Sequence, residues 1–194
     1  RILMNAQGNG TFDLAVIGAG SAGFSAAIRG AELGARVALV GFGTIGGTCV
    51  NVGCVPSKTL IRATEALPQA RGAARFNGLR ATASVVDWGA VIAQKDELVQ
   101  DLRRAKYQDL LSAYPLISYR DGPARLTSDG VAVNGDALAA DKIIVASGTA
   151  PAPVAIPGID DVPVLTSTTA MEMENLPASL LVVGGGFIGC ELAQ

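Results

Sequence analysis

The chain has 194 residues, of which 49% are hydrophobic and 16% are charged, so it can bury a sizeable core. Its formal net charge is −2, it has no Lys/Arg-rich run, and only 5% of its residues are aromatic, which argues against nucleic acid and anionic membranes as partners. No apolar run reaches the roughly 18 residues of a membrane span, and residues 1–10 lack the apolar stretch of a signal peptide, so we expect a cytoplasmic protein.

The first predicted elements are a strand, a glycine-rich turn, a helix and a second strand. Residues 12–17 (FDLAVI) predict a short buried strand, and residues 18–23 (GAGSAG) form the turn. A helix is predicted over 21–34, and residues 35–40 (ARVALV) predict the second strand. This order is typical of a βαβ unit with a parallel sheet.

The middle of the chain predicts two helices and a set of short strands. The helices are expected at about 54–70 and 87–113, with Asp87 as an N-cap and the charged residues of the second helix on its solvated face. Over 116–146, short apolar runs alternate with turn residues. This pattern predicts an antiparallel meander followed by a last parallel strand at 142–146.

The C-terminal part predicts a linker and a second strand–turn–helix unit. Four prolines lie in residues 150–163, which indicates a linker. Residues 180–183 predict another buried strand. The segment GGGFIG at 184–189 predicts a second glycine turn before a helix. The expected fold class is α/β: a Rossmann-like parallel sheet with an antiparallel β-meander insertion, and the start of a second Rossmann unit. Because the chain starts at Arg1 and ends inside a predicted helix, we expect a fragment of a longer protein.

The first glycine turn is a candidate dinucleotide site. Gly18, Gly20 and Gly23 form a GxGxxG string between a predicted strand and a predicted helix, the context in which the string is informative. The glycines permit a tight turn, close approach of a pyrophosphate and helix–strand packing, and the helix N-terminus attracts phosphate. An acidic residue for a ribose hydroxyl is expected at the end of the second strand, but Gly41 stands there.

Cys49 and Cys54 lie in the segment GGTCVNVGCVPSK. A structural zinc site needs three or four ligands, and the chain has no histidine and only Cys190 to add. A purely structural disulfide is unexpected in a cytoplasmic protein and would close only a small loop. We therefore favour a redox pair.

The spacing of the two cysteines also constrains the backbone. In a regular helix, Cα atoms five residues apart are roughly 8–9 Å from each other, whereas a disulfide needs less than about 7 Å. We therefore expect an irregular segment, which Asn51 and Gly53 would tolerate. Pro56 suits the first turn of the next helix, so Cys54 would lie near a helix N-terminus that favours a thiolate, with Lys58 one turn beyond.

These segments resemble the flavin-dependent pyridine nucleotide–disulfide oxidoreductases. GGTCVNVGCVPSK is similar to their redox-active segment, GAGSAG to their turn for the FAD pyrophosphate, and VASGTAPAPVAIPG (145–158) to their second flavin-contact segment. GGGFIGCELAQ (184–194) is similar to the opening of their NAD(P) domain. Within the family, the cysteine segment together with LRRAKYQDLL and GPARL is most similar to the mercuric reductase branch.

The resemblance implies a disordered or linker N-terminus at 1–11, an FAD-binding domain with a redox disulfide at 12–158, and a linker with the truncated start of an NAD(P)-binding domain at 159–194. It implies bound FAD, NADPH as a substrate bound mostly outside this chain, and a homodimer of the full-length protein. The implied reaction reduces Hg(II) to Hg(0), with soft thiolates holding the soft metal ion, and the fragment alone is expected to be inactive. The alternatives are a dihydrolipoyl or glutathione-type reductase and, from another class, a flavin-binding or thiol metal-trapping module.

The resemblance also implies roles for single residues. Cys49 and Cys54 would form the disulfide and, when reduced, hold Hg(II). Lys58 would approach the flavin and pair with Glu191, completing the catalytic set. The residues implied to contact FAD are Gly18, Gly20, Ser21, Gly23, Gly43, Thr48, Lys58, Ala124, Ala146, Ser147, Gly148 and Thr149. Those implied to contact NADPH are Gly184, Gly186 and Gly189.

Overall fold

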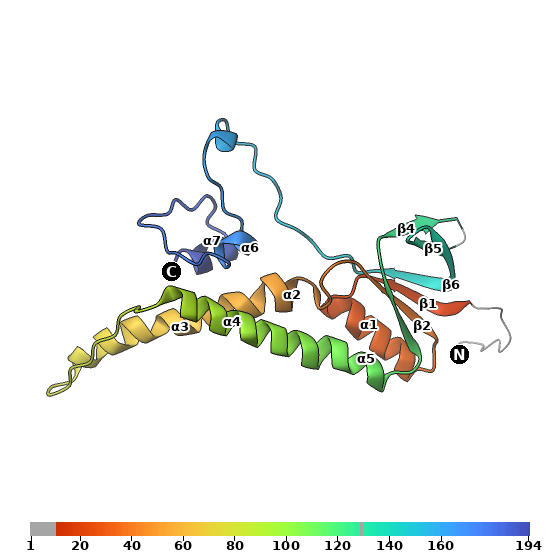
Figure 1. The fold of residues 1–194 in the computed structure, drawn as a ribbon, viewed down its shortest axis with the longest axis horizontal. Coiled ribbons are helices and arrows are strands. Elements are labelled where there is room, and N and C mark those ends of the chain that lie inside the picture. The colour runs from red at the N-terminus through yellow and green to blue at the C-terminus, as the bar shows by residue number, and fades with distance from the viewer. Residues whose placement is uncertain (1–10, 129) are drawn as a thin grey trace. The chain divides into compact units, whose positions relative to one another are not determined.

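The computed structural model describes residues 11–128 and 130–194 (Figure 1). They form two units. The sheet unit comprises the described residues up to Gly47 together with Leu102–Thr149, and the cysteine unit comprises Thr48–Asp101 together with Ala150–Gln194. The segment 1–11 expected to be disordered or a linker lies almost wholly outside the described residues, and the predicted domain boundaries stay predictions.

The sheet unit is built on six strands in the order β3-β2-β1-β6-β5-β4. β3, β2, β1 and β6 run parallel, whereas β5 and β4 continue the sheet in antiparallel fashion. The expected α/β class, with a parallel sheet and an antiparallel meander, is confirmed. The strands are β1 (Phe12–Ile17), β2 (Val37–Gly41), β3 (Ile117–Asp121), β4 (Ala124–Thr127), β5 (Gly130–Val133) and β6 (Asp136–Val145).

The core of this unit lies around β1 and β2, joined by α1 (Ser21–Glu32) (Figure 1). All five residues of β2 are buried, as expected for a strand with both faces covered. α1 packs closely on the sheet because its residues there are small: a Cβ on Gly30 would lie 3.1 Å from both Leu14 Cδ2 and Val37 Cγ2. Burial of each large apolar side chain here contributes about 1.5–3 kcal/mol to the free energy of folding.

Two strand predictions in the sheet unit need correction or refinement. The run at 116–119, predicted to open the antiparallel meander, belongs to β3, which lies parallel to β2. The prediction was wrong because a short apolar run does not reveal the direction of its partner. β6 contains the predicted parallel strand but is longer: residues 136–139 pair antiparallel with β5, and 140–145 pair parallel with β1.

A tight turn of Asn134 and Gly135 joins β5 to β6. Both have positive φ, +54° and +93°, as a two-residue type I′ hairpin requires. The Asn134 side chain donates through Nδ2 to the carbonyl of Asp121 at 2.9 Å, and its backbone N–H donates to Pro123 O at 3.2 Å. The hairpin tip is thereby fastened to the end of β3.

The predicted helices are present. Asp87 is the expected N-cap, since Ala90 N–H donates to its Oδ1 at 3.0 Å. One detail was wrong: Lys95, expected on the solvated face, is only 3% exposed, and its ammonium reaches Asp96. A lysine can bury its aliphatic stem while its charged end meets a partner. The helices are α2 (Gly47–Val52), α3 (Cys54–Gly72), α4 (Trp88–Arg103), a π-helical turn at Arg104–Gln108 and α5 (Asp109–Ala113), with a 3-10 turn at Ala73–Arg75 after α3.

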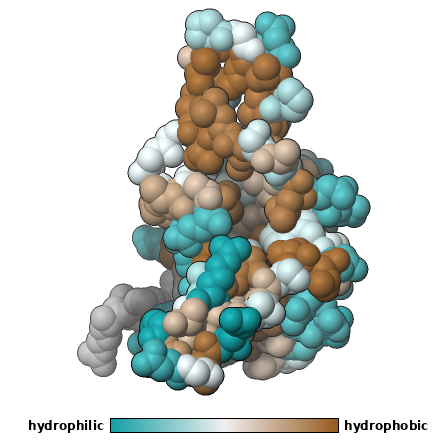
Figure 2. All heavy atoms as spheres, turned by 90° about the vertical axis from the view of Figure 1, so that its left-hand side faces the viewer, coloured by the Kyte–Doolittle hydropathy of each residue, from teal (hydrophilic) through white to brown (hydrophobic). Residues whose placement is uncertain are grey.

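The C-terminal segment contains a 3-10 turn at Ile159–Asp161 and the short helices α6 (Ser167–Ala170) and α7 (Phe187–Leu192). The strand predicted at 180–183 is absent, so that prediction was wrong: no strand in the described chain lies beside these residues to share backbone hydrogen bonds, and Leu181 is 88% exposed. Figure 2 shows hydrophobic side chains at the surface of the molecule. None of the helices in the described part of the chain has the length and apolar character needed to cross a membrane.

Candidate functional site

The first glycine turn leaves no room for side chains. Gly18 has φ +117°, and a Cβ there would overlap the carbonyl oxygen of Ala146. A Cβ on Gly23 would overlap the carbonyl oxygen of Gly18. Gly18 N–H donates to Val40 O at 2.7 Å, so the turn is tied to β2. The close backbone packing predicted from the GxGxxG string is therefore present.

The turn also suits an anionic ligand. Gly20 is the N-cap of α1 and offers no side-chain oxygen to its first N–H groups, and the first turn of the helix contains no acidic residue. Free N–H groups at a helix N-terminus attract phosphate through their partial positive charge. The residues present therefore fit the pyrophosphate of a dinucleotide such as FAD, through Gly18, Gly20, Ser21 and Gly23.

The chain returns to this turn just before the cysteines. Gly46 N–H donates to Ala19 O at 2.9 Å, and a Cβ on Gly47 would lie 2.6 Å from Gly20 Cα. Cys49 follows Gly47 by two residues, so covalent geometry alone keeps the two Cα atoms within about 7.6 Å.

Of the other residues of the sheet unit that are expected to contact the flavin, only some are shown beside the glycine turn. Ala146 directly contacts Gly18, and a Cβ on Gly18 would lie 3.0 Å from Ser147 N, so the start of the 146–149 segment lies against the turn. Gly43 has open space around it and φ +78°. Ala124 begins β4 and pairs with Val133. For these residues and for Gly148 and Thr149, contact with FAD stays a prediction.

Tyr107, which was not among the residues predicted from the sequence, contacts the first turn of α1. Its hydroxyl and that of Ser21 are 2.9 Å apart and share a hydrogen bond, and its ring meets Phe24 edge-on at 4.9 Å between centroids. Tyr107 is 8% exposed and lies on the π-helical turn, a feature frequent at functional sites. The π-helical turn that places Tyr107 there could not be predicted from the spacing of apolar residues along the helix.

Tyr119 was also missed. A Cβ built on Gly41 would overlap the Tyr119 hydroxyl and would lie 2.8 Å from Ala19 Cβ. Burial, and next the negative charge of Asp121, raise the pKa of Tyr119 above its usual value, so the phenol is neutral at physiological pH. The clue in the sequence was the acidic Asp121 at the end of the same strand. Because β3 was predicted to be antiparallel, that end was not expected beside Gly41.

The cysteine segment has the predicted irregularity. α2 ends at Val52 and α3 starts at Cys54, with the break at Gly53 (φ −133°, ψ −117°). A Cβ on Gly53 would lie 2.9 Å from Thr48 O and 3.3 Å from Cys49 Cα, so the backbone at this break has no room for a side chain. Cys49 is half-buried and Cys54 is exposed. Their disulfide, Hg(II) binding by the pair and a flavin contact of Thr48 stay predictions.

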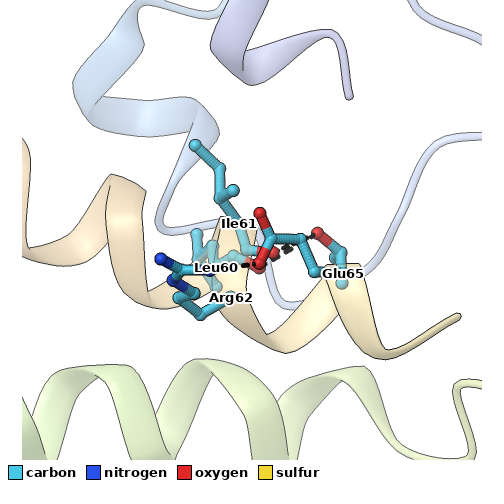
Figure 3. A network of polar contacts seen from close by, with 5 residues as sticks. Leu60, Ile61, Arg62 and Glu65 are labelled. Carbon is cyan, nitrogen blue, oxygen red and sulfur yellow. Dashed lines mark hydrogen bonds and ion pairs between the residues drawn. The ribbon is translucent and has the colours of Figure 1, made fainter. Parts of the chain in front are cut away.

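Pro56 is fully buried in the first turn of α3, as expected, and Lys58 lies one turn beyond Cys54. The ammonium of Lys58 donates to Glu191 Oε1, so the contact implied by the resemblance is present. Further along α3, Figure 3 shows the exposed pair of Arg62 and Glu65, whose atoms are 2.7 Å apart. The catalytic roles of Lys58 and Glu191 stay predictions.

The second glycine turn repeats the backbone of the first. Gly184 has φ +111°, and a Cβ on Gly189 would overlap the carbonyl oxygen of Gly184. In the first turn, a Cβ on Gly23 would overlap the carbonyl oxygen of Gly18 in the same way. Gly186 is the N-cap of α7 and accepts a hydrogen bond from Cys190 N–H at 3.0 Å. The turn conformation expected for a dinucleotide is thus present, whereas binding of NADPH by Gly184, Gly186 and Gly189 stays a prediction.

Comparisons with known proteins agree with this geometry. Residues 12–194 match the model of the family described as pyridine nucleotide-disulphide oxidoreductase. A mercuric reductase of Lysinibacillus sphaericus is 43% identical over 183 residues, covering 94% of this chain and 33% of the relative. A mercuric reductase of Streptomyces lividans is 45% identical over 197 residues, covering 97% of this chain and 41% of the relative.

Solved structures point the same way. The HOCl-induced flavoprotein disulfide reductase RclA from Escherichia coli superposes with a TM-score of 0.77 at 32% identity, covering 93% of this chain and 38% of that one. The chain thus spans about a third to two fifths of the length of these relatives. The matched residues include both glycine turns and the cysteine segment, and the chain belongs to the pyridine nucleotide-disulphide oxidoreductase family.

Proposed function

We propose that the full-length protein carrying this chain is an NADPH-dependent mercuric reductase, and that these residues supply its FAD turn and its redox cysteines. The single observation that carries the proposal is the path of the chain from the glycine turn to the cysteine pair. Gly47 packs against Gly20 in the turn, and Cys49 follows two residues later. A thiol pair is thereby attached directly to the loop that borders a dinucleotide site.

In this proposal the glycine turn holds FAD and the cysteine pair carries the electrons and the metal ion. The N–H groups at the start of α1 and the bare backbone of Gly18, Gly20 and Gly23 hold the FAD pyrophosphate, and FAD when bound supplies two-electron transfer between NADPH and the disulfide. The bare backbone of Gly53 packs against Thr48 and Cys49 at the break before Cys54, and both thiolates bind Hg(II) as soft ligands.

Lys58 and Glu191 complete the proposed catalytic set. Cys54 is the first residue of α3. Lys58 adds a positive charge one turn further along the same face, and its contact with Glu191 fixes the position of its ammonium. We further propose that NADPH binds near Gly184, Gly186 and Gly189. The full-length protein would be a homodimer in the cytoplasm.

The test measures NADPH oxidation by the full-length protein with Hg(II) and excess thiol, with lipoamide, and with glutathione disulfide. We expect turnover with Hg(II), and loss of at least about a hundredfold in Cys49→Ser and Cys54→Ser, since each removes the redox pair. Cys190→Ser is the matched control, because this exposed cysteine lies on α7 and its thiol donates only to Gly185 O at 3.6 Å.

Two results would overturn the proposal. Turnover with lipoamide or glutathione disulfide but not with Hg(II) would assign the chain to another branch of the same family. FAD binding without disulfide electrons in a reductive titration would indicate a flavin-binding or thiol metal-trapping module.

A further inference from the structure

The second strand of the βαβ unit lacks the acidic side chain that binds ribose in such folds. In a dinucleotide-binding unit, an Asp or Glu at the end of this strand accepts hydrogen bonds from the ribose hydroxyls. Here β2 ends in Gly41, and Phe42 follows. In this structure the space for a side chain at 41 is occupied: a Cβ there would overlap the hydroxyl of Tyr119 and lie 2.8 Å from Ala19 Cβ.

The hydroxyl of Tyr119 therefore takes the place of the missing side chain. It lies beside the end of β2 and near Ala19, which belongs to the glycine turn. A phenol can donate one hydrogen bond and accept others, so it matches a ribose hydroxyl, which does the same.

A carboxylate is also present, one strand further across the sheet. Asp121 ends β3 and is the register partner of Gly41. Gly122 N–H donates to Gly41 O at 2.7 Å, and Asn134 Nδ2 donates to Asp121 O at 2.9 Å, so both ends of the peptide group between Asp121 and Gly122 are hydrogen-bonded. Tyr119 lies two residues earlier on the same strand, so its side chain and that of Asp121 lie on the same face of the sheet. Burial, and after it the charge of Asp121, raise the pKa of Tyr119.

We propose that Tyr119 and Asp121 together replace the acidic residue of β2 and hydrogen-bond the adenosine ribose of FAD. This inference rests on the proposed binding of FAD and adds the residues that recognise its adenosine half. Both groups come from β3, so the ribose-binding function has moved one strand across the carboxyl edge of the sheet.

The experiment measures dissociation constants by flavin fluorescence, using the full-length apoprotein and three ligands. These are FAD, an FAD analogue that lacks the hydroxyls of the adenosine ribose, and FMN, which lacks the adenosine entirely. The variants are Tyr119→Phe and Asp121→Asn. Tyr114→Phe is the matched control, because Tyr114 follows α5 and lies outside the proposed contact.

We expect Tyr119→Phe to weaken FAD binding by about two- to thirteenfold, the effect of one neutral hydrogen bond, and Asp121→Asn by roughly tenfold or more. Both variants should bind FMN and the analogue as the wild type does. Tyr114→Phe should bind all three ligands unchanged.

Wild-type affinity of both variants for FAD would overturn the inference, as would an equal loss for FAD and the analogue, because the two residues would then act through the fold. In either case the proposed function stands, since FAD is still bound. If the wild type binds neither flavin, the proposed function itself is wrong, and the inference fails with it.

Discussion

The hydroxyls of Ser21 and Tyr107 share a hydrogen bond of 2.9 Å that joins the first residue of α1 to a π-helical turn 86 positions later. This bond fixes the side chain of a residue expected to contact FAD. Tyr107→Phe removes only the hydroxyl, so we expect the free energy of unfolding to fall by about 1 kcal/mol and FAD to bind several-fold more weakly.

Denaturant titration and flavin fluorescence measure both effects in the full-length protein. The double variant with Ser21→Ala completes a mutant cycle, in which we expect a coupling energy of about 1 kcal/mol. Additive effects of the two substitutions would contradict the role given to this bond.

Gly23→Ala tests the packing of the glycine turn. The new Cβ would overlap Gly18 O, which is backbone and cannot move aside. We expect loss of FAD binding and a free energy of unfolding lower by at least about 3 kcal/mol. The control is Gly72→Ala at the end of α3, where a Cβ meets nothing within 4 Å. There we expect a gain of about 0.5–1 kcal/mol, because alanine lowers the entropy of the unfolded chain.

Gly53→Ala tests the break between α2 and α3. Its Cβ would lie 2.9 Å from Thr48 O and 3.3 Å from Cys49 Cα, so the two helices must separate to accept it. We expect a loss of about 1–3 kcal/mol in stability and a slower oxidation of the cysteine pair. Thiol titration after timed oxidation measures the rate. Wild-type oxidation would show that the close packing at Gly53 does not bring the cysteines together.

Lys58→Met tests whether this lysine acts through its charge. The side chains of Lys58 and Glu191 are 56% and 33% exposed, so losing their ion pair should change stability by less than about 1 kcal/mol. We expect the flavin midpoint potential to become more negative, since a nearby positive charge favours the reduced cofactor. Arg62→Met, which breaks the exposed pair with Glu65 on the same helix, should leave this potential unchanged. Equal potentials in all three proteins would refute a charge effect of Lys58.

Asp121→Asn should lower the pKa of Tyr119 partway toward 10.0, because burial, the larger cause of the shift, remains. The raised pKa means that the folded protein keeps this proton to higher pH than the unfolded chain does. Its contribution to stability is therefore complete below pH 10 and is lost as the pH rises through the folded pKa. Ultraviolet titration, with Tyr119→Phe identifying the signal, measures the shift. A pKa at or below 10.0 for Tyr119 in the wild type would contradict the environment described here.

Features with strong local signals could be predicted from the sequence. The glycine turn between a strand and a helix, the N-cap at Asp87 and the break near Gly53 each depend on a few adjacent residues. The second glycine turn illustrates this best: Gly184 and Gly189 adopt the predicted conformation even though the strand before them is absent.

Features that depend on distant partners could not be predicted. An apolar run such as that of β3 carries no mark of whether its neighbour is parallel, so the position of Asp121 beside Gly41 was hidden. The bond from Tyr107 to Ser21 and the burial of Lys95 likewise arise from packing across the chain. The absent strand at 180–183 shows the converse, since an apolar segment forms a strand only beside another one.

β6 belongs to both the antiparallel and the parallel part of the sheet, and its end leads directly to Ala146, whose carbonyl packs on Gly18. An insertion or deletion of one residue within β6 would therefore turn its side chains to the opposite face and displace that carbonyl at the same time. The loop at 76–86 between α3 and α4 belongs to no strand and is under no such restraint. Among homologous chains, length changes should accumulate in that loop and be excluded from β6.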